Sequence, residues 1–261
     1  MKIRILKLSE DKAEFLLEET TPSIANALRR AILSEVPVMA VHEVIFFTNT
    51  TDYPDEYIAH RLAMIPIRTD LKNYSMEEDS VVTLRLDREA QEEEEVVYSG
   101  DLESSDPLII PINSRIPIVT MKRGQKLKFE AIVKLGKGRW HAKWQPVSGL
   151  RYSYTPIYEV LPEALPESCK NCESLEKDRD GVVVIRDPYS CPKCAAELER
   201  MLNSGDSRVQ VKWDNTRIFI GFESNGQLPP FRIILAAADE LIKKFDEFES
   251  KLKKALSSDK D

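Results

Sequence analysis

The hydrophobic pattern near the amino terminus predicts two strands joined by a turn. Residues 2–8 place Ile3 and Ile5 between charged side chains, and this period of two residues is typical of a half-buried strand. Residues 13–18 form a second, mostly apolar run. The polar residues between the two runs suit a turn, so we expect the chain to begin with two adjacent strands.

A short amphipathic helix is predicted next. Thr21 is placed to act as its N-cap and Pro22 as its first helical residue, and Pro37 ends it. One face is too large for such a short helix to hide alone, so the helix predicts a partner. The positions that share this face are Ile24, Leu28, Ala31, Ile32 and Glu35. A strand, a polar loop and a second short helix are expected before Ile67.

The central part of the chain contains short apolar runs separated by proline, glycine or charge clusters, a pattern typical of strands. These runs are Val81–Leu86, Leu108–Pro111, Ile116–Met121 and Lys126–Leu135. Glu92–Glu95 is expected in a solvated loop, because like charges repel and rarely share a buried surface. Further along, alternating runs on either side of Asp214 and Asn215 predict a β-hairpin. Their apolar members are Val209, Val211, Trp213, Ile218, Ile220 and Phe222.

The last predicted element is a long amphipathic helix. No glycine or proline interrupts residues 231–261, and apolar side chains recur at alternating spacings of four and three. This seam consists of Ile234, Ala238, Leu241, Phe245, Phe248, Leu252 and Ala255. A helix of about 25 residues is about 40 Å long, so part of the seam would extend beyond a small domain. A core-facing helix is the ordinary explanation, but the heptad-like spacing favours a contact between chains.

Composition narrows the class of protein. The 261 residues carry a formal net charge of −7, which argues against a general nucleic-acid coat and favours protein partners. A hydrophobic content of 42% supports a packed core in one large domain or two small ones. No apolar run reaches the length of a membrane span, and the amino terminus lacks the apolar core of a signal peptide. A cytoplasmic location is expected.

The cysteine spacing indicates a metal site. The four cysteines are Cys169, Cys172, Cys191 and Cys194. Two residues separate the members of each pair, which is zinc-ribbon spacing, and Val182–Ile185 after Asp180-Gly181 suits a hairpin that brings the pairs together. Zinc held by four thiolates is the first expectation, and free thiols or disulfides are the alternative. The role is expected to be structural, because the module offers no open catalytic ligand.

Three segments together resemble a known family. They are Asn26–Pro37 (NALRRAILSEVP) with AVHEVIFF and DEYIAHRLAMIPI after it, Asp106–Ser148, and Phe222–Lys244. In this order they are similar to the assembly subunits of multisubunit RNA polymerases. That family includes the archaeal D subunit, the bacterial α-subunit amino-terminal domain and the third-largest subunit of eukaryotic RNA polymerase II. The resemblance covers most of the chain, so it is more specific than any single short motif.

The resemblance implies an α+β fold. Both chain ends, residues 1–40 and 207–261, would form a dimerisation domain of β-strands plus amphipathic helices. An inserted, mostly-β domain would occupy residues 41–165, and a small cysteine module residues 166–206. The spacing of apolar residues independently predicts partner-seeking helices at both ends of the chain, which agrees with this arrangement.

The resemblance also implies a non-catalytic role in assembly. The terminal helices would pair with small subunit L, and the pair would recruit subunit N and dock on the second-largest catalytic subunit, with DNA reached only through the complex. Polar residues of the first helix, otherwise expected to face solvent, would contact the large subunits through arginine forks. The expected interface residues are Asn26, Leu28, Arg29, Arg30, Ile32, His60, Arg61, Ile234, Ala238, Leu241, Phe245, Phe248 and Leu252.

Many archaeal members of this family carry a ferredoxin-like iron–sulfur module where this chain has its cysteines. The ferredoxin pattern is incomplete here, because Glu197 stands where a third closely spaced cysteine would fall. An iron–sulfur cluster therefore ranks below zinc as the expected cofactor.

Two other classes of function are weighed against assembly. A free-standing zinc or iron–sulfur protein, acting in redox chemistry or in binding, would be a stable monomer with metal-dependent activity. An enzyme that uses His60 would need a nucleophile or a carboxylate suitably spaced around it, and the sequence supplies neither. It also lacks clustered aspartates of the kind that hold paired magnesium ions. We expect no catalytic residue on this chain.

Overall fold

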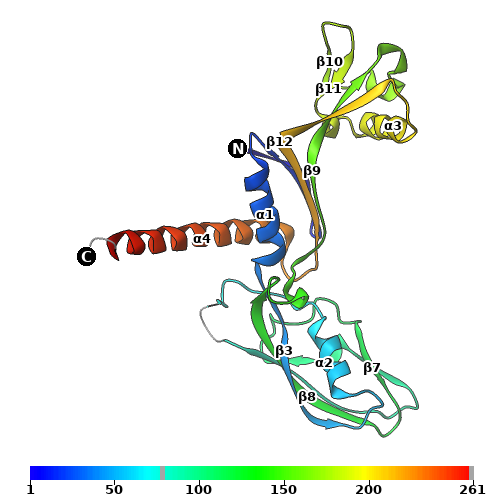
Figure 1. The fold of residues 1–261 in the computed structure, drawn as a ribbon. Coiled ribbons are helices and arrows are strands. Elements are labelled where there is room, and N and C mark those ends of the chain that lie inside the picture. The colour runs from blue at the N-terminus through cyan, green and yellow to red at the C-terminus, as the bar shows by residue number, and fades with distance from the viewer. Residues whose placement is uncertain (77–79, 259–261) are drawn as a thin grey trace. The chain divides into compact units, whose positions relative to one another are not determined.

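Contacts within the chain divide it into two compact units. The computed structural model describes residues 1–76 and 80–258 and has an α+β fold (Figure 1). The first unit contains residues 1–8, 13–26 and 151–221, and the second contains the described part of 9–12, 27–150 and 222–261. The three domains expected from the sequence follow different boundaries and stay a prediction.

A six-stranded sheet provides most of the framework of the first unit (Figure 1). Its strands, in spatial order, are β1 (Lys2–Leu8), β2 (Lys12–Glu18), β12 (Val209–Ser224), β9 (Val147–Val160), β11 (Val183–Ile185) and β10 (Leu175–Lys177). β1 pairs antiparallel with β2, and β11 pairs antiparallel with both β9 and β10. Helix α1 (Pro22–Ser34) begins in this unit, and α3 (Pro192–Asn203) lies wholly within it.

The two predicted amino-terminal strands are confirmed as β1 and β2, but the expected burial of Ile3 and Ile5 is wrong. These side chains are 56% and 52% exposed. Arg4 and Leu6, which point to the other face, are the half-buried ones. The reason is that successive side chains alternate between the faces of a strand, and β1 is an edge strand whose Ile3 face this chain leaves open.

The hairpin predicted around Asp214 and Asn215 is also wrong. A single strand, β12, continues through both residues. The Asp214 carboxylate accepts hydrogen bonds from the backbone N–H and the hydroxyl of Thr216, at 2.9 and 2.7 Å. Tight two-residue turns favour a glycine that adopts positive φ, and this pair has none. The aspartate is instead satisfied by a local side-chain bond while the chain stays extended.

The second unit contains one four-stranded and one two-stranded sheet (Figure 1). The larger sheet has the order β3 (Pro37–Asn49), β8 (Lys126–Lys137), β4 (Val82–Glu89) and β6 (Glu103–Ser104). In the smaller sheet β5 (Glu95–Tyr98) pairs with β7 (Pro117–Met121), and the helix of this region is α2 (Asp55–Ala63). One hydrophobic core joins them, with Ile58 and Leu62 of α2 buried in the same cluster as Phe129 of β8.

Three of the four central strand predictions are confirmed, as β4, β7 and β8. Leu108–Pro111 is not a strand and contributes only an isolated bridge between Ile67 and Pro111. Side chains satisfy its backbone instead, because the Leu108 N–H donates to Asp106 at 2.8 Å and the Ser104 hydroxyl donates to the Ile109 carbonyl at 2.7 Å.

The acidic run is a solvated loop over most of its length. Glu92–Glu94 are exposed and lie outside any strand, as predicted. Glu95 departs from the prediction, because it begins β5 and its carboxylate pairs with Arg88 at 2.7 Å. A run of like charges therefore does not predict the structure of its last residue when that residue pairs with a cation on another strand.

The amphipathic helices predicted near the two ends of the chain are confirmed. In α1 the N–H of Ile24 donates to the Thr21 hydroxyl at 3.4 Å, as expected of an N-cap. The carboxyl-terminal helix is α4 (Pro230–Ser258), which Figure 1 shows as one uninterrupted helix. The last positions of its predicted extent, residues 259–261, lie outside the described residues.

Candidate partner interface

The far part of α4 has no cover in this chain. Every residue from Ile242 to Ser257 is exposed. Phe245, Phe248 and Leu252 of the predicted seam are 70%, 65% and 46% exposed. Large contiguous apolar surface of this kind marks an interaction site, since a helix with one apolar face normally buries that face.

The beginning of α4 has the opposite environment. Ile233 and Ala237 are fully buried, and the seam residues Ile234, Ala238 and Leu241 are half-buried. This part is therefore covered within the chain, whereas the helix beyond Leu241 is presented to solvent.

A buried ion cluster holds the beginning of α4 in place. Glu240 and Glu35 are each only 8% exposed, and Lys137 of β8 pairs with Glu240 and lies 3.9 Å from Glu35. Lys244 reaches the other Glu35 oxygen at 2.7 Å. Buried charges are tolerated only when they are paired, so the cluster fixes α4 against β8 and the residue that follows α1. Glu35, which the helical spacing placed on an apolar face, is thus a buried ionic contact.

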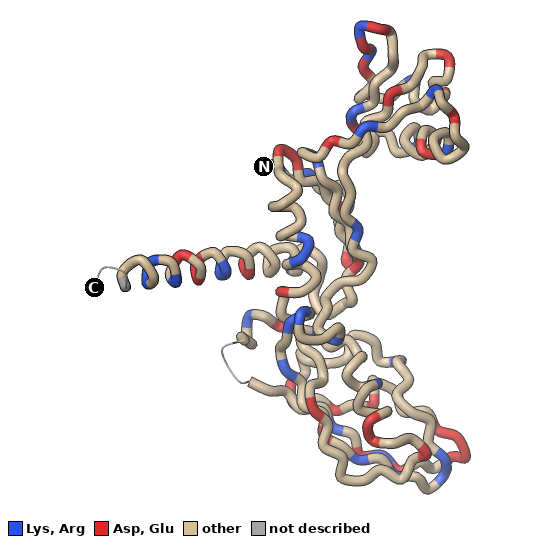
Figure 2. The backbone as a smooth tube through the Cα atoms, in the orientation of Figure 1, with Lys and Arg blue, Asp and Glu red and all other residues tan. Residues whose placement is uncertain are grey.

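The charged residues of the exposed part of α4 are largely paired with one another. Glu247 lies 3.8 Å from Lys251, and Glu249 lies 2.6 Å from Lys253. Figure 2 shows basic and acidic residues interspersed along this helix. Pairs four residues apart stabilise an isolated helix by about 0.2–0.5 kcal/mol each. These ion pairs help to keep this part of α4 helical. Because the charges are paired with each other, the apolar side chains are its main surface for binding a partner.

The predicted residues of α1 fall into two groups. Asn26 and Arg30 are exposed, and Leu28 and Arg29 are half-buried. Ile32 is fully buried, so it supports the helix from beneath and does not form part of the surface.

The predicted residues of α2 lie in its last turn. His60 is exposed, and the half-buried Arg61 donates a hydrogen bond to the carbonyl of Pro117. On the same helix Tyr57 stacks on Tyr53 with ring centroids 5.1 Å apart. Arg61 is therefore already engaged within the unit, while His60 is available at the surface.

The heptad spacing missed several exposed apolar residues. Ile242 and Leu256 of α4 are 57% and 60% exposed, and Leu235 is 53% exposed. They lie beside the seam, so a count of positions three and four apart passes over them. A helical projection of all apolar residues would have shown a face wider than a two-position seam. Ile24 of α1, 52% exposed, was counted on the apolar face but not among the interface residues.

The four cysteines converge in the first unit. In the structure Cys169 is bonded to Cys194, and Cys172 to Cys191. The predicted hairpin is present as β10 and β11, with Gly181 in the turn at φ 81°. Cys169 and Cys194 are fully buried and share a small core with Leu198 and Val160. The bonds therefore crosslink the segment before β10 to the start of α3.

Four convergent sulfur atoms are the donor set of a structural zinc site, so the residues fit zinc once both bonds are reduced. In the structure all four sulfurs are joined in pairs. Across the described residues no group of three or more His, Cys, Asp or Glu side chains is placed to hold a metal ion. The zinc and iron–sulfur expectations stay predictions.

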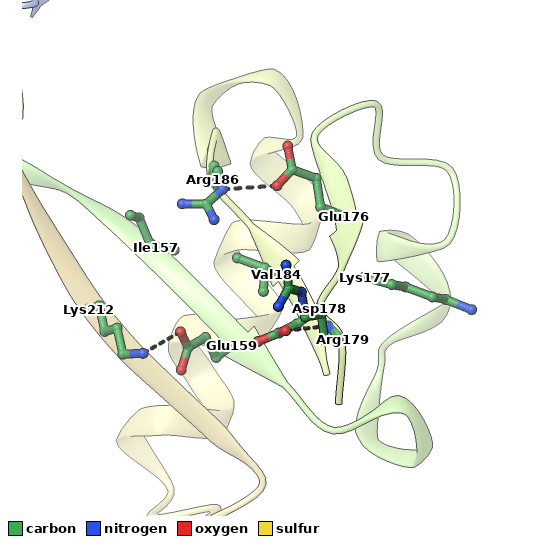
Figure 3. A pocket seen from close by; sticks show the side chains of 9 residues that line it. All are labelled: Ile157, Glu159, Glu176, Lys177, Asp178, Arg179, Val184, Arg186 and Lys212. Carbon is green, nitrogen blue, oxygen red and sulfur yellow. Dashed lines mark hydrogen bonds and ion pairs between the residues drawn. The ribbon is translucent and has the colours of Figure 1, made fainter. Parts of the chain in front are cut away.

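The surface beside the β10–β11 hairpin contains a hollow of about 450 Å³ (Figure 3). Two of its three acidic side chains are paired with cations: Glu159 with Lys212 at 2.6 Å and Glu176 with Arg186 at 2.9 Å. The third, Asp178, accepts a hydrogen bond from the backbone N–H of Arg179. General acid–base catalysis needs a group whose proton is poised for transfer, and paired surface ions do not supply one. The hollow is best described as a polar surface.

No helix in the described part of the chain is both long enough and apolar enough to cross a membrane.

A family model defines the class of protein to which this architecture belongs. Residues 44–149, which include α2 and most of the two sheets of the second unit, match the model of the RNA polymerase Rpb3/RpoA insert domain. This range lies within residues 41–165, where the resemblance placed an inserted domain.

Full-length relatives extend the match to the helices. The chain is 40% identical to DNA-directed RNA polymerase subunit Rpo3 of Pyrococcus furiosus, covering 98% of this chain and 99% of that protein. Identity to the Rpo3 subunits of Archaeoglobus fulgidus and Methanosphaera stadtmanae is 33% and 32%, each covering 94% of this chain and 96% of the relative. The chain belongs to the Rpo3 family of DNA-directed RNA polymerase subunits.

Proposed function

We propose that this RNA polymerase subunit is a non-catalytic assembly platform, active in the cytoplasm, that forms a heterodimer with small subunit L through α1 and α4. The observation that carries the proposal is the exposed apolar part of α4 beyond Leu241. Nucleotidyl transfer is assigned to other chains of the complex.

The energetics support pairing through this surface. Fully burying a side chain the size of phenylalanine or leucine contributes about 1.5–3 kcal/mol. Phe245, Phe248 and Leu252 together with the neighbouring Ile242 and Leu256 supply five such side chains, each at least 46% exposed. Part of this gain offsets the loss of freedom on association, and the remainder favours pairing.

A second part of the proposal assigns the polar surfaces. Asn26, Arg29 and Arg30 of α1, with His60 and Arg61 of α2, are proposed to contact the large subunits and subunit N. Arginine suits such contacts because its planar fork pairs with carboxylates in a bidentate manner. Arg61, already bonded to Pro117, would act by holding the end of α2 in position.

The cysteine module is proposed to bind one zinc ion when reduced. Cys169, Cys172, Cys191 and Cys194 would supply four thiolates, and the ion would take over the crosslinking role of the two disulfides without a catalytic function. Elemental analysis of protein purified without oxygen tests this, and one zinc per chain is expected. Iron with acid-labile sulfide in place of zinc would overturn it, as would four reduced thiols with no metal.

Expression with and without the small partner tests the main proposal. Alone, the chain is expected to aggregate or to lose α4 beyond Leu241 to limited proteolysis. Co-expressed, it should elute as a one-to-one complex in which α4 resists the protease. A monodisperse, fully folded chain whose α4 is protected in the absence of a partner would contradict the proposal and favour a free-standing metal or redox protein.

A further inference from the structure

The first unit carries an apolar groove of about 780 Å³ that belongs to neither of the surfaces assigned above. Rings dominate its lining, which includes Tyr154, Pro156, Pro188, Tyr189, Trp213 and Phe219. All of these residues lie within the first unit, so the groove is complete in that unit alone.

The groove occupies one face of the six-stranded sheet. Tyr154 and Pro156 alternate along β9 with Ile157 and Glu159, which line the polar hollow of Figure 3. Successive residues of a strand point to opposite faces. Between residues 154 and 159 the sheet therefore has a charged hollow on one face and a groove of aromatic and proline rings on the other. Ser153 and Arg151 also line the groove, outside this alternation.

The groove contains stacked rings and an exposed donor, the indole N–H of Trp213. Tyr189 stacks on Phe219 with ring centroids 5.6 Å apart and planes 8° apart, and the Arg151 guanidinium lies 5.4 Å from the centre of the Phe219 ring. Trp213 is 59% exposed, and within the described residues its indole N–H makes no hydrogen bond. Rigid aromatic walls lose little entropy on binding, and an exposed indole N–H is available to a peptide carbonyl.

Strand geometry gives the groove a length. Arg151 and Tyr158 both line it and are seven residues apart on β9, a distance of about 23 Å in a strand. A polyproline II segment rises about 3.1 Å per residue, so about seven residues would span the groove.

The two ends of the groove have opposite charge. Lys7 lines the end where Glu14 pairs with Arg151, and it forms no ion pair within the described residues. Glu199 of α3 lines the end near Tyr158 and is likewise unpaired there. Burial first, and the negative charge of Glu199 second, raise the pKa of Tyr158.

We propose that this groove binds an extended, proline-containing segment of another protein chain in the polyproline II conformation. An acidic side chain of the segment pairs with Lys7 at one end and a basic side chain pairs with Glu199 at the other. Grooves lined with aromatic rings recognise such segments because the conformation is already formed before binding. The proposal does not depend on the pairing of α4.

A fluorescent peptide of sequence EPPLPPR tests the proposal by anisotropy with the full chain, co-purified with a partner subunit if pairing is needed for solubility. Saturable binding is expected, and Trp213→Ala should weaken it at least tenfold, since tryptophan is the commonest anchor of such sites. Trp140→Ala is the matched control, because Trp140 is also largely exposed, at 53%, and lies in the second unit. It should leave the affinity unchanged.

The charges are tested with a second peptide that carries glutamine at both ends. It should bind about two- to tenfold more weakly, as expected for two exposed ion pairs. The combined variant Lys7→Gln with Glu199→Gln should bind both peptides equally. The proposal that the groove binds such a segment would be overturned by the absence of saturable binding, or by equal weakening of binding in Trp213→Ala and Trp140→Ala. Equal binding of both peptides to the unmodified chain would overturn the charge assignment. Either failure leaves the α4 experiment untouched.

Discussion

The two parts of α4 have the same hydrophobic period and opposite surroundings. Up to Leu241 the helix is covered within the chain, with Ile233 and Ala237 fully buried and Glu240 held by Lys137. From Ile242 onward every described residue is exposed, although phenylalanine and leucine recur with the same spacing. The comparison teaches that the hydrophobic period identifies the apolar face of a helix. It does not tell how much of that face the rest of the same chain covers and how much is left for another chain.

The largest expected effect comes from charging the exposed part of the seam. Phe245→Asp should weaken pairing with the small partner more than a thousandfold, because it removes apolar burial and places an unpaired carboxylate in the interface. Leu241→Asp, at the boundary between the two parts, should also abolish pairing. Analytical ultracentrifugation or co-purification measures the loss.

Ser250→Asp is the matched control for these variants. Ser250 is exposed on the same helix and lies five positions after Phe245, so its side chain points away from the seam. It adds the same single charge and should pair normally. Normal heterodimer formation by Phe245→Asp would refute α4 as the interface.

The packed part of α4 is tested through its ion cluster. Glu240→Ala leaves Lys137 buried without its closest carboxylate and should lower the free energy of unfolding by about 3 kcal/mol. Glu247→Ala removes a comparable but exposed pair with Lys251 and should cost no more than about 0.5 kcal/mol. Urea unfolding of both variants measures the difference. Equal costs would mean that the two parts of the helix do not differ in the way described.

The cysteine module provides a contrast with α4, because its crosslinks lie within one chain. Cys169→Ser combined with Cys194→Ser opens a bond that spans 25 residues and should lower the stability of the first unit by about 2–4 kcal/mol. Unfolding in non-reducing buffer measures this loss. Pairing through α4 should be unchanged, and a variant that lost pairing as well would show that the module and the interface depend on each other.

The sequence was sufficient for the elements whose signal is local. The N-cap and proline of α1 and the unbroken period of α4 predicted both helices, and the cysteine spacing predicted convergence of the four sulfurs. It failed where the outcome depends on neighbours far along the chain. Ile3 and Ile5 were expected to be buried, yet the cover of an edge strand depends on what lies beside it. Likewise, Asp214-Asn215 suits a turn, but β12 continues through both residues between its neighbours β2 and β9.

The same limit applies to the candidate sites. Periodicity found the seam but could not show that its first part is covered, because the packing of Glu240 on Lys137 brings together residues 103 positions apart. The aromatic groove escaped the sequence altogether. Its lining comes from β1, β2, β9, β12, α3 and the short segment Pro188–Ser190, and no short motif joins residues from such separate segments.

The smallest expected effect is a loss of stability at low pH. Asp187 is half-buried, which by itself raises a carboxyl pKa, but the Arg4 guanidinium at 2.6 and 2.9 Å and Arg217 at 3.6 Å outweigh this effect and lower the pKa of Asp187. A carboxyl whose pKa is lower in the folded state contributes stability above its unfolded value of about 3.9 and loses it as the pH falls through the folded value. Stability of the first unit should therefore decline below about pH 4.

The variant Asp187→Asn should be less stable than the unmodified protein at pH 7 and should lose less stability on acidification, as measured by unfolding between pH 7 and pH 2. An identical acid dependence in both proteins would mean that the bond from Asp187 to Arg4 does not help to hold the module to the sheet.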